Sequence, residues 1–284
     1  MTPGLELALG SMLFLGLVDL VYQRGARAGV QPHHFVMLQG WFFAPAVVLY
    51  GLATGTLALE SALLWGMGAG LFVFIALYHF ARALKIGSIS IVTPIFRLSF
   101  TVTVALAVLL LAEPLTAWKL AGLAFAFVAV WLLLGGESAA AAAPAGARAS
   151  LVQVLIAMAA MGAANFLYKV GAGTGSSPAT FIAGQAAAFM PLSTVFAWIV
   201  DRGILLPRGG WKYGAAAATL FLVALILLFE SLARGEASVL VPITQMGFVV
   251  SAVFGLAFLR EPITARKAAG LVLAVAALAS LAHS

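Results

Sequence analysis

Ionisable side chains inside long apolar stretches are the residues of this sequence best suited to chemistry, and Arg97 is the deepest of them. It lies about nine residues into the apolar stretch Ser88–Leu111, which is roughly 13 Å along a helix. Its guanidinium group is suited to binding a carboxylate or phosphate through two hydrogen bonds. The alternatives are a structural ion pair, or hydrogen bonds to carbonyl groups freed by Pro94. Because a charge at such depth is costly, Arg97 is a candidate binding residue.

Asp19 is the acidic residue placed best to meet Arg97. It lies three residues before Tyr22, near the end of the first apolar stretch. Asp19 and Arg97 differ in depth by roughly 8 Å, a gap that their side chains can bridge. One interpretation is an ion pair that opens and closes as substrate or a proton arrives. The interpretation that we favour is that Asp19 simply lies at the interface with water.

Several neutral polar residues also lie within apolar stretches. With the two charged residues, the predicted substrate-binding set is Asp19, Tyr22, His79, Arg97, Asn165, Tyr168 and Gln245. The aromatic members offer hydroxyl or imidazole contacts, although such residues near helix ends are more often interfacial anchors. Gln39 and Gln185 are expected to bond between helices rather than to substrate.

Proline residues lie inside two of the apolar stretches. Pro94 and Pro242 each remove a backbone hydrogen bond, and we expect them to act as hinges, the alternative being kinks that only shape packing. Gly66 and Gly70 have the spacing that allows close helix contact.

Two Glu-Pro turns have a predicted structural role. Glu113 and Glu261 precede helices whose N-caps are expected to be Thr116 and Thr264. A carboxylate in such a turn meets the positive end of a helix dipole.

The elements that must position these residues are membrane helices. Hydrophobic residues make up 64% of the chain and charged residues 8%, whereas soluble domains carry roughly 25% charged residues. We therefore predict an all-α integral membrane protein.

Met1–Glu6 lacks Lys and Arg, so the first stretch is expected to be a retained helix. The ten predicted spans are Leu5–Tyr22, Phe35–Leu52, Leu63–Leu84, Ser88–Leu111, Ala117–Leu134, Leu151–Val170, Thr180–Val200, Tyr213–Leu232, Ala237–Leu259 and Ala265–Leu281.

The sequence repeats itself once. An offset of 146 pairs Tyr22 with Tyr168 and Pro32 with Pro178, and an offset of 148 pairs Pro94 with Pro242. At the same offsets Asp19 pairs with Asn165, and Arg97 with Gln245. The repeat predicts two five-helix units, residues 1–134 and 151–284, joined by the linker 135–150. Five spans per unit predict that the second unit is inverted in the membrane.

The net charge of +6 is explained by loop residues that set orientation, so we expect no nucleic-acid partner. Eleven Lys and Arg residues fall in loops on one side and three, Lys119, Lys169 and Arg234, on the other. The chain is therefore expected to span the cell inner (plasma) membrane with both termini outside.

Two segments resemble one known family. Ser90–Phe100 with Leu111-Ala-Glu-Pro-Leu-Thr116, and Ser238–Ile243 with Leu259-Arg-Glu-Pro-Ile-Thr264, are similar to the fourth helix and following turn of the EamA family of the drug/metabolite transporter superfamily. The resemblance covers essentially the whole chain. It implies export or exchange of small metabolites through a cavity lined mainly by the first, third, fourth, sixth, eighth and ninth spans. It also implies cytoplasmic termini in many members, opposite to the charge count.

We expect a secondary transporter that exports a small polar metabolite with an anionic group, such as an amino acid, by alternating access. The alternatives are a multidrug cation exporter, and a lipid-linked sugar flippase or facilitative pore.

The chain has no cysteine, ATP-binding loop or clustered acid, base and nucleophile, so neither an enzyme nor a cofactor is expected. The adjacent histidines His33 and His34 weakly indicate a metal site. Zinc needs three or four ligands, however, so no metal site is predicted. The sequence is compatible with a homo-oligomer.

The orientation can be tested with a reporter fused to the C-terminus that is active only in the cytoplasm. The charge count predicts no reporter signal, because the C-terminus is expected outside. A strong signal would overturn this orientation.

Overall fold

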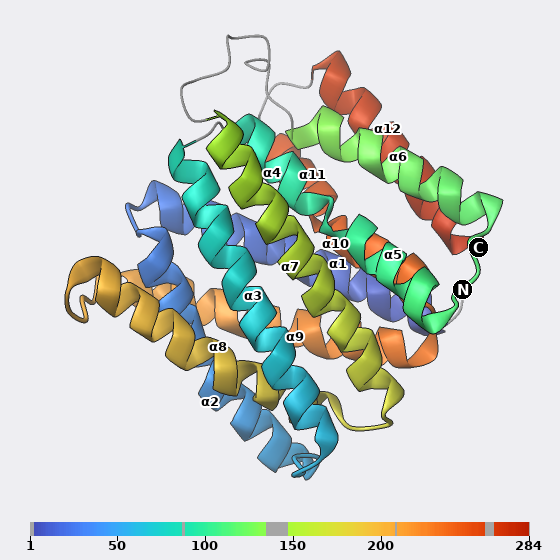
Figure 1. Ribbon diagram of the computed structural model, residues 1–284. Helices are drawn as coiled ribbons and strands as arrows, with labels where there is room; N and C mark the ends of the chain where they lie inside the picture. Colours follow the sequence, from blue (N-terminus) through green and yellow to red (C-terminus); the bar gives the residue numbers. More distant parts are fainter. Residues whose placement is uncertain (1–2, 87–88, 135–146, 208, 259–263, 284) are drawn as a thin grey trace.

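The computed structural model describes residues 3–86, 89–134, 147–207, 209–258 and 264–283, and throughout these residues the regular structure is helical (Figure 1). The helices are α1 (Pro3–Arg27), α2 (Pro32–Thr54), α3 (Ser61–Ile86), α4 (Ile89–Arg97), α5 (Ser99–Leu111), α6 (Ala117–Leu134), α7 (Ala147–Gly173), α8 (Pro178–Asp201), α9 (Gly210–Arg234), α10 (Ala237–Gln245), α11 (Gly247–Phe258) and α12 (Ala265–Ala282). The all-α prediction is confirmed for the described chain.

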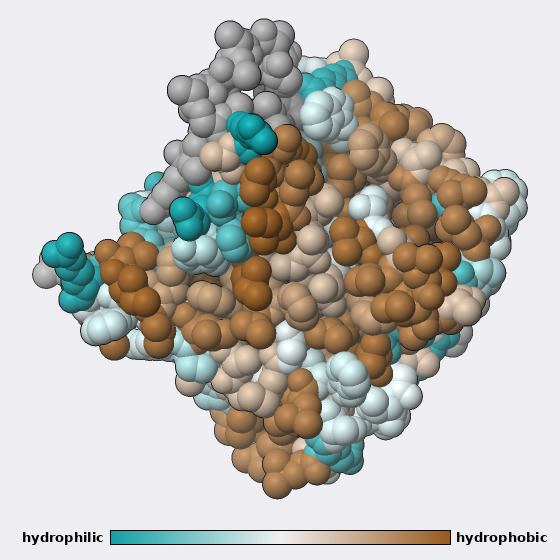
Figure 2. Space-filling view, viewed as in Figure 1, coloured by the Kyte–Doolittle hydropathy of each residue, from teal (hydrophilic) through white to brown (hydrophobic). Residues whose placement is uncertain are grey.

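Within the described residues, nine segments are long and apolar enough to cross a membrane, and a tenth, Ala117–Leu133, is shorter. The prediction of ten full spans is therefore met in part. Large apolar side chains cover the outside of the bundle, as lipid contact requires. Figure 2 shows hydrophobic groups over much of the visible face, with hydrophilic groups mainly toward its edges. Exposed examples are Leu49, Leu64, Leu109, Trp118, Trp198 and Val272.

Two of the spans are interrupted at equivalent positions. α4 ends and α5 begins around Leu98, whose ψ is 6°, and α10 ends and α11 begins around Met246, whose ψ is 13°. A regular α-helix has ψ of about −42°. Each interruption lies four residues after a proline, Pro94 or Pro242. The breaks thus accompany the predicted hinge prolines, while hinge motion stays a prediction.

Helix packing follows the repeat. α3 packs on α7 and α8, and the equivalent helices show the same pattern, since α9 packs on α1 and α2. α2 also packs on α8, its own equivalent, and α6 on α12, which lie side by side in Figure 1. Exchanging each helix for its equivalent leaves these contacts unchanged, as a two-fold relation requires. The domain boundaries and the inverted insertion of the second unit stay predictions.

Gly66 and Gly70 of α3 make a close backbone contact, as their spacing predicts. A Cβ atom on Gly66 would lie 1.9 Å from the carbonyl oxygen of Phe181, and one on Gly70 would lie 2.4 Å from that of Gln185. Both oxygens belong to the backbone of α8. No side chain fits there, so α3 and α8 meet backbone to backbone.

The first Glu-Pro turn joins the two halves. Both carboxylate oxygens of Glu113 accept hydrogen bonds at 2.8 Å, one from the backbone N–H of Ala237 and one from that of Ser238. Glu113 therefore caps the N-terminus of α10, in the other half, where the helix dipole favours negative charge. Thr116 and Thr264 accept from the N–H groups of Lys119 and Lys267, so both predicted N-caps are confirmed. Glu261 lies outside the described residues.

Lys119 and Lys169, two of the three basic residues predicted on the outer side, form hydrogen bonds near this turn. The fully buried Lys119 ammonium donates to the carbonyl of Pro114 at 2.6 Å and pairs with Glu236. The ammonium of Lys169 donates to the carbonyls of Leu232 and Gly235 at 2.9 and 2.6 Å. These bonds satisfy carbonyl groups at the C-terminal end of α9, where the dipole favours a cation.

Gly66→Ala should destabilise the protein by about 1–3 kcal/mol, because the new methyl group meets backbone that cannot move without separating α3 from α8. Thermal unfolding in detergent measures the change. The matched control is Gly173→Ala at the end of α7, where a Cβ atom meets nothing within 4 Å. Equal melting temperatures for the two variants would contradict the close contact.

Candidate functional site

A cavity of about 180 Å³ lies between the two halves. Its walls come from α1, α2, α3 and α4 of the first half and α7, α8, α9 and α10 of the second. The family resemblance implied six lining spans, all of which contribute, and α2 and α8 add two more. The polar lining residues are Asp19, Tyr22, Gln39, Thr93, Arg97, Asn165, Tyr168, Gln185 and Gln245. The aromatic ones include Phe43, Phe80, Phe96, Phe189 and Phe221.

The predicted contact between Asp19 and Arg97 is present in this cavity. Nη2 of Arg97 lies 2.5 Å from Oδ1 and 2.6 Å from Oδ2 of Asp19. The two side chains are 16% and 21% exposed, so the pair is mostly buried but open to the cavity. Arg97 is the last residue of α4, where the helix dipole favours a cation. The break after α4 therefore helps to place the guanidinium group.

A third residue touches this pair from the second half. The hydroxyl of Ser251 in α11 lies 3.4 Å from Oδ2 of Asp19, and the backbone carbonyls of Gly16 and Gly247 are competing acceptors at 3.4 and 3.3 Å. Asp19 therefore lies within reach of side chains from two other helices. Its position relative to the membrane interface stays a prediction.

The two tyrosines of the predicted set make matching hydrogen bonds. The Tyr22 hydroxyl donates to Oε1 of Gln39 at 2.6 Å, and the Tyr168 hydroxyl donates to Oε1 of Gln185. Each ring also packs edge-on against a phenylalanine, with centroids 4.7 Å apart for Tyr22–Phe35 and 4.5 Å for Tyr168–Phe181. Gln39 and Gln185 thus bond between helices, as predicted, and also line the cavity.

Asn165 and Gln245 occupy the places in the second half that Asp19 and Arg97 occupy in the first. Both line the cavity. Nδ2 of Asn165 is buried and has no hydrogen-bond partner among the described residues. A buried unsatisfied amide costs about 1–3 kcal/mol, so Asn165 offers a donor that a bound molecule can use.

His79 is the member of the predicted set that the structure places elsewhere. It is absent from the described residues that line the cavity, and its Nδ1 lies 2.6 Å from Oε1 of Gln153 in α7. Its predicted contact with substrate therefore finds no support in this cavity.

The sequence analysis left out two polar residues near the ion pair. Thr93 lines the cavity beside Pro94, and Ser251 reaches Asp19 from α11. Serine and threonine are common in membrane helices and often bond to their own backbone. Their residue type alone therefore does not identify them as functional residues. Adjacency to a predicted hinge proline could have drawn attention to Thr93.

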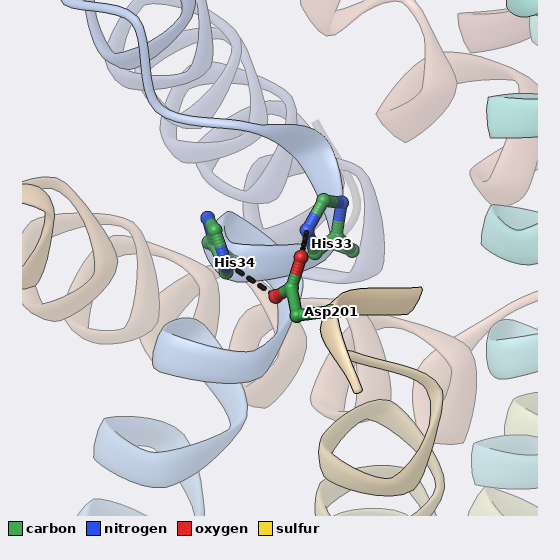
Figure 3. A group of neighbouring side chains, drawn as sticks. All are labelled: His33, His34 and Asp201. Carbon is green, nitrogen blue, oxygen red and sulfur yellow. Dashed lines mark hydrogen bonds and ion pairs between the residues drawn. The ribbon is translucent and has the colours of Figure 1, made fainter. Parts of the chain in front are cut away.

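A separate polar cluster joins α2 and α8. Nε2 of His33 lies 3.1 Å from Oδ1 of Asp201, and Nε2 of His34 lies 2.7 Å from Oδ2 (Figure 3). One ligand atom from each of the three residues lies within 4.8 Å of the others. Asp201 is a third possible metal ligand that the sequence did not indicate beside His33 and His34.

Comparisons with known proteins address the family and the fold. A sequence model described as the EamA-like transporter family matches residues 2–135 and 148–282. Curated proteins yielded no significant match. One solved crystal structure has a TM-score of 0.82 over 98% of this chain and 95% of its own, at 17% identity. At that identity the likeness shows the fold alone.

A double-mutant cycle on Asp19→Asn and Arg97→Gln tests the ion pair. Each single change should cost about 1–3 kcal/mol, because it leaves the other charge unpaired in a mostly buried place. The double variant should cost less than the sum, with a coupling energy of about 0.5–3 kcal/mol. Unfolding of the four proteins in detergent measures it.

The matched control is the exposed pair Glu230–Arg234, with side chains 34% and 46% exposed. Its coupling energy should stay below about 0.5 kcal/mol. Equal coupling in the two cycles would argue against a formed Asp19–Arg97 pair.

Proposed function

The chain belongs to the EamA-like transporter family, a family of membrane transporters rather than enzymes, and from this premise we propose what it carries and how. The proposed cargo is a small polar metabolite with an anionic group, favoured to be an amino acid. The proposed process is secondary transport by alternating access, with net export across the inner membrane. The two halves would rock around the cavity that holds Asp19 and Arg97.

The observation that carries the proposal is the guanidinium group of Arg97 at the cavity wall. Asp19 pairs with Nη2, one of its three nitrogens. The remaining donors are suited to a substrate carboxylate, which arginine binds with two parallel hydrogen bonds. Such a carboxylate would compete with Asp19 for the same cation.

Charge balance favours a zwitterion over a simple anion. Asp19 and Arg97 are the charged residues among those that line the cavity, and together they are neutral. A simple anion would leave a net negative charge in a largely apolar space, which is costly. An amino acid keeps the cavity neutral, because its carboxylate faces Arg97 while its ammonium group faces Asp19. The unsatisfied amide of Asn165 offers a further donor.

The cavity argues against the alternative cargoes. Its volume of about 180 Å³ is below the range of about 300–1,000 Å³ typical of sites for drug-sized ligands. A multidrug cation exporter needs an uncompensated carboxylate, whereas Asp19 is paired with Arg97. A flippase needs a long apolar groove for a lipid chain, and the polar residues around this cavity favour a small solute instead.

Arg97→Gln in proteoliposomes should reduce amino-acid transport by about a hundredfold or more, since losing a charged hydrogen-bond partner costs about 3 kcal/mol. The assay compares uptake of radiolabelled amino acids, a quaternary ammonium dye and a lipid-linked sugar. Arg97→Lys keeps the charge but loses the planar pair of donors, so it should retain partial activity.

Arg266→Gln is the matched control, because Arg266 donates to the carbonyl of Trp131 and does not line the cavity. It should transport normally. If Arg97→Gln moves every tested amino acid at the normal rate, the proposed carboxylate contact is wrong. Transport of the dye or the lipid-linked sugar alone would favour the corresponding alternative.

A further inference from the structure

The cluster of His33, His34 and Asp201 lies where two equivalent helices end beside one another. The histidines are in the first turn of α2, and Asp201 is the last residue of α8 (Figure 3). The three side chains are 11–14% exposed, so they are largely shielded from water. The two imidazole rings, with centroids 4.2 Å apart, approach the carboxylate from one helix. None of the three lines the central cavity.

The helix dipoles place these side chains unfavourably. The N-terminus of α2 carries partial positive charge, which disfavours protonated imidazole. The C-terminus of α8 carries partial negative charge, which disfavours the Asp201 carboxylate, and the contacts with His33 and His34 offset this effect. A cation held between the two helix ends would compensate the carboxylate, while the neutral imidazoles keep lone pairs for it.

We propose that His33, His34 and Asp201 bind a divalent transition-metal ion, with zinc as the best match. Two imidazole nitrogens and one carboxylate oxygen are the donors that zinc accepts, and three protein ligands with one water complete a four-coordinate site. Magnesium and calcium prefer all-oxygen sites, and the chain has no cysteine to favour softer ions.

The observed distances leave room for an ion after a small adjustment. Donors bound to one tetrahedral zinc ion are about 3.3 Å apart, as follows from bond lengths of about 2.0–2.1 Å. Nε2 of His33 lies 3.1 Å from Oδ1 of Asp201 and Nε2 of His34 lies 2.7 Å from Oδ2, so the His34 contact has to lengthen by about 0.6 Å. Nδ1 of His34 has no hydrogen-bond partner among the described residues, so zinc binding through Nε2 breaks no hydrogen bond made by Nδ1.

The bound ion would tie α2 to α8 at one end of their contact. At the other end, neutral groups already join the two helices, because the hydroxyl of Ser177 donates to the carbonyl of Thr56 at 2.5 Å. The cluster lies six residues, or about 9 Å, along α2 from Gln39 at the cavity. Metal binding would therefore restrain α2 and α8 beside the transport cavity without occupying it.

The test uses the full chain without a histidine tag, purified in detergent and stripped with a chelator. Zinc should bind with a stoichiometry of one per chain, measured by competition with a chromophoric chelator. It should also raise the melting temperature by about 5 °C at a concentration near 100 times the dissociation constant, whereas magnesium should not.

Asp201→Asn, which keeps the shape of the side chain, should weaken zinc binding by about tenfold or more. His34→Gln should do the same, and it serves if Asp201→Asn is unstable before zinc is added. His283→Gln, near the C-terminus, is the control and should bind zinc as the unmodified chain does. No zinc binding by the unmodified chain, or binding by both the Asp201 and the His34 variant as tight as that of the unmodified chain, would overturn the proposal.

Discussion

Lipid offers no hydrogen bonds, and this constraint governs the placement of every polar group inside the bundle. A charged or amide side chain in a span must find its partner on another helix or face an enclosed polar space. Arg97 satisfies both conditions, since it pairs with Asp19 and lines the cavity. Tyr22 with Gln39 and Tyr168 with Gln185 meet the same demand in the two halves. The cavity thus gathers one set of these polar groups, and others, such as Lys119 with Glu236 and His79 with Gln153, find partners elsewhere between helices.

Sequence reasoning succeeded where the relevant physics is local or depends on depth. Segment length and hydropathy located the spans, and glycine spacing located the α3–α8 contact. The pairing of Asp19 with Arg97 was accessible because their predicted depths differ by only roughly 8 Å, a gap that the two side chains can bridge. The interruptions at Leu98 and Met246 were less accessible, since each lies one helical turn beyond the proline that drew attention.

Contacts between residues far apart in the chain could not be read from local pattern. Glu113 was expected to face the N-terminus of the helix that follows it, α6, whereas it caps α10 in the other half of the chain. Asp201 lies 167 residues from His34, so nothing in the spacing of the histidines pointed to it. His79 was chosen for its residue type alone, and its partner Gln153 comes from a helix whose packing the sequence did not specify. Such contacts depend on which helix faces pack together.

The pairing of Arg97 with Asp19 also constrains how two halves of common origin, as the sequence repeat predicts, can diverge. At the same two places the second half has Gln245 and Asn165, so one half holds a charged pair and the other a neutral pair. Replacing either member of the charged pair alone leaves an uncompensated charge in a mostly buried place. The evolutionary path between the two states therefore crosses a less stable intermediate, unless both residues change together. Among descendants of one ancestral half, acid and arginine should be inherited or lost as a unit.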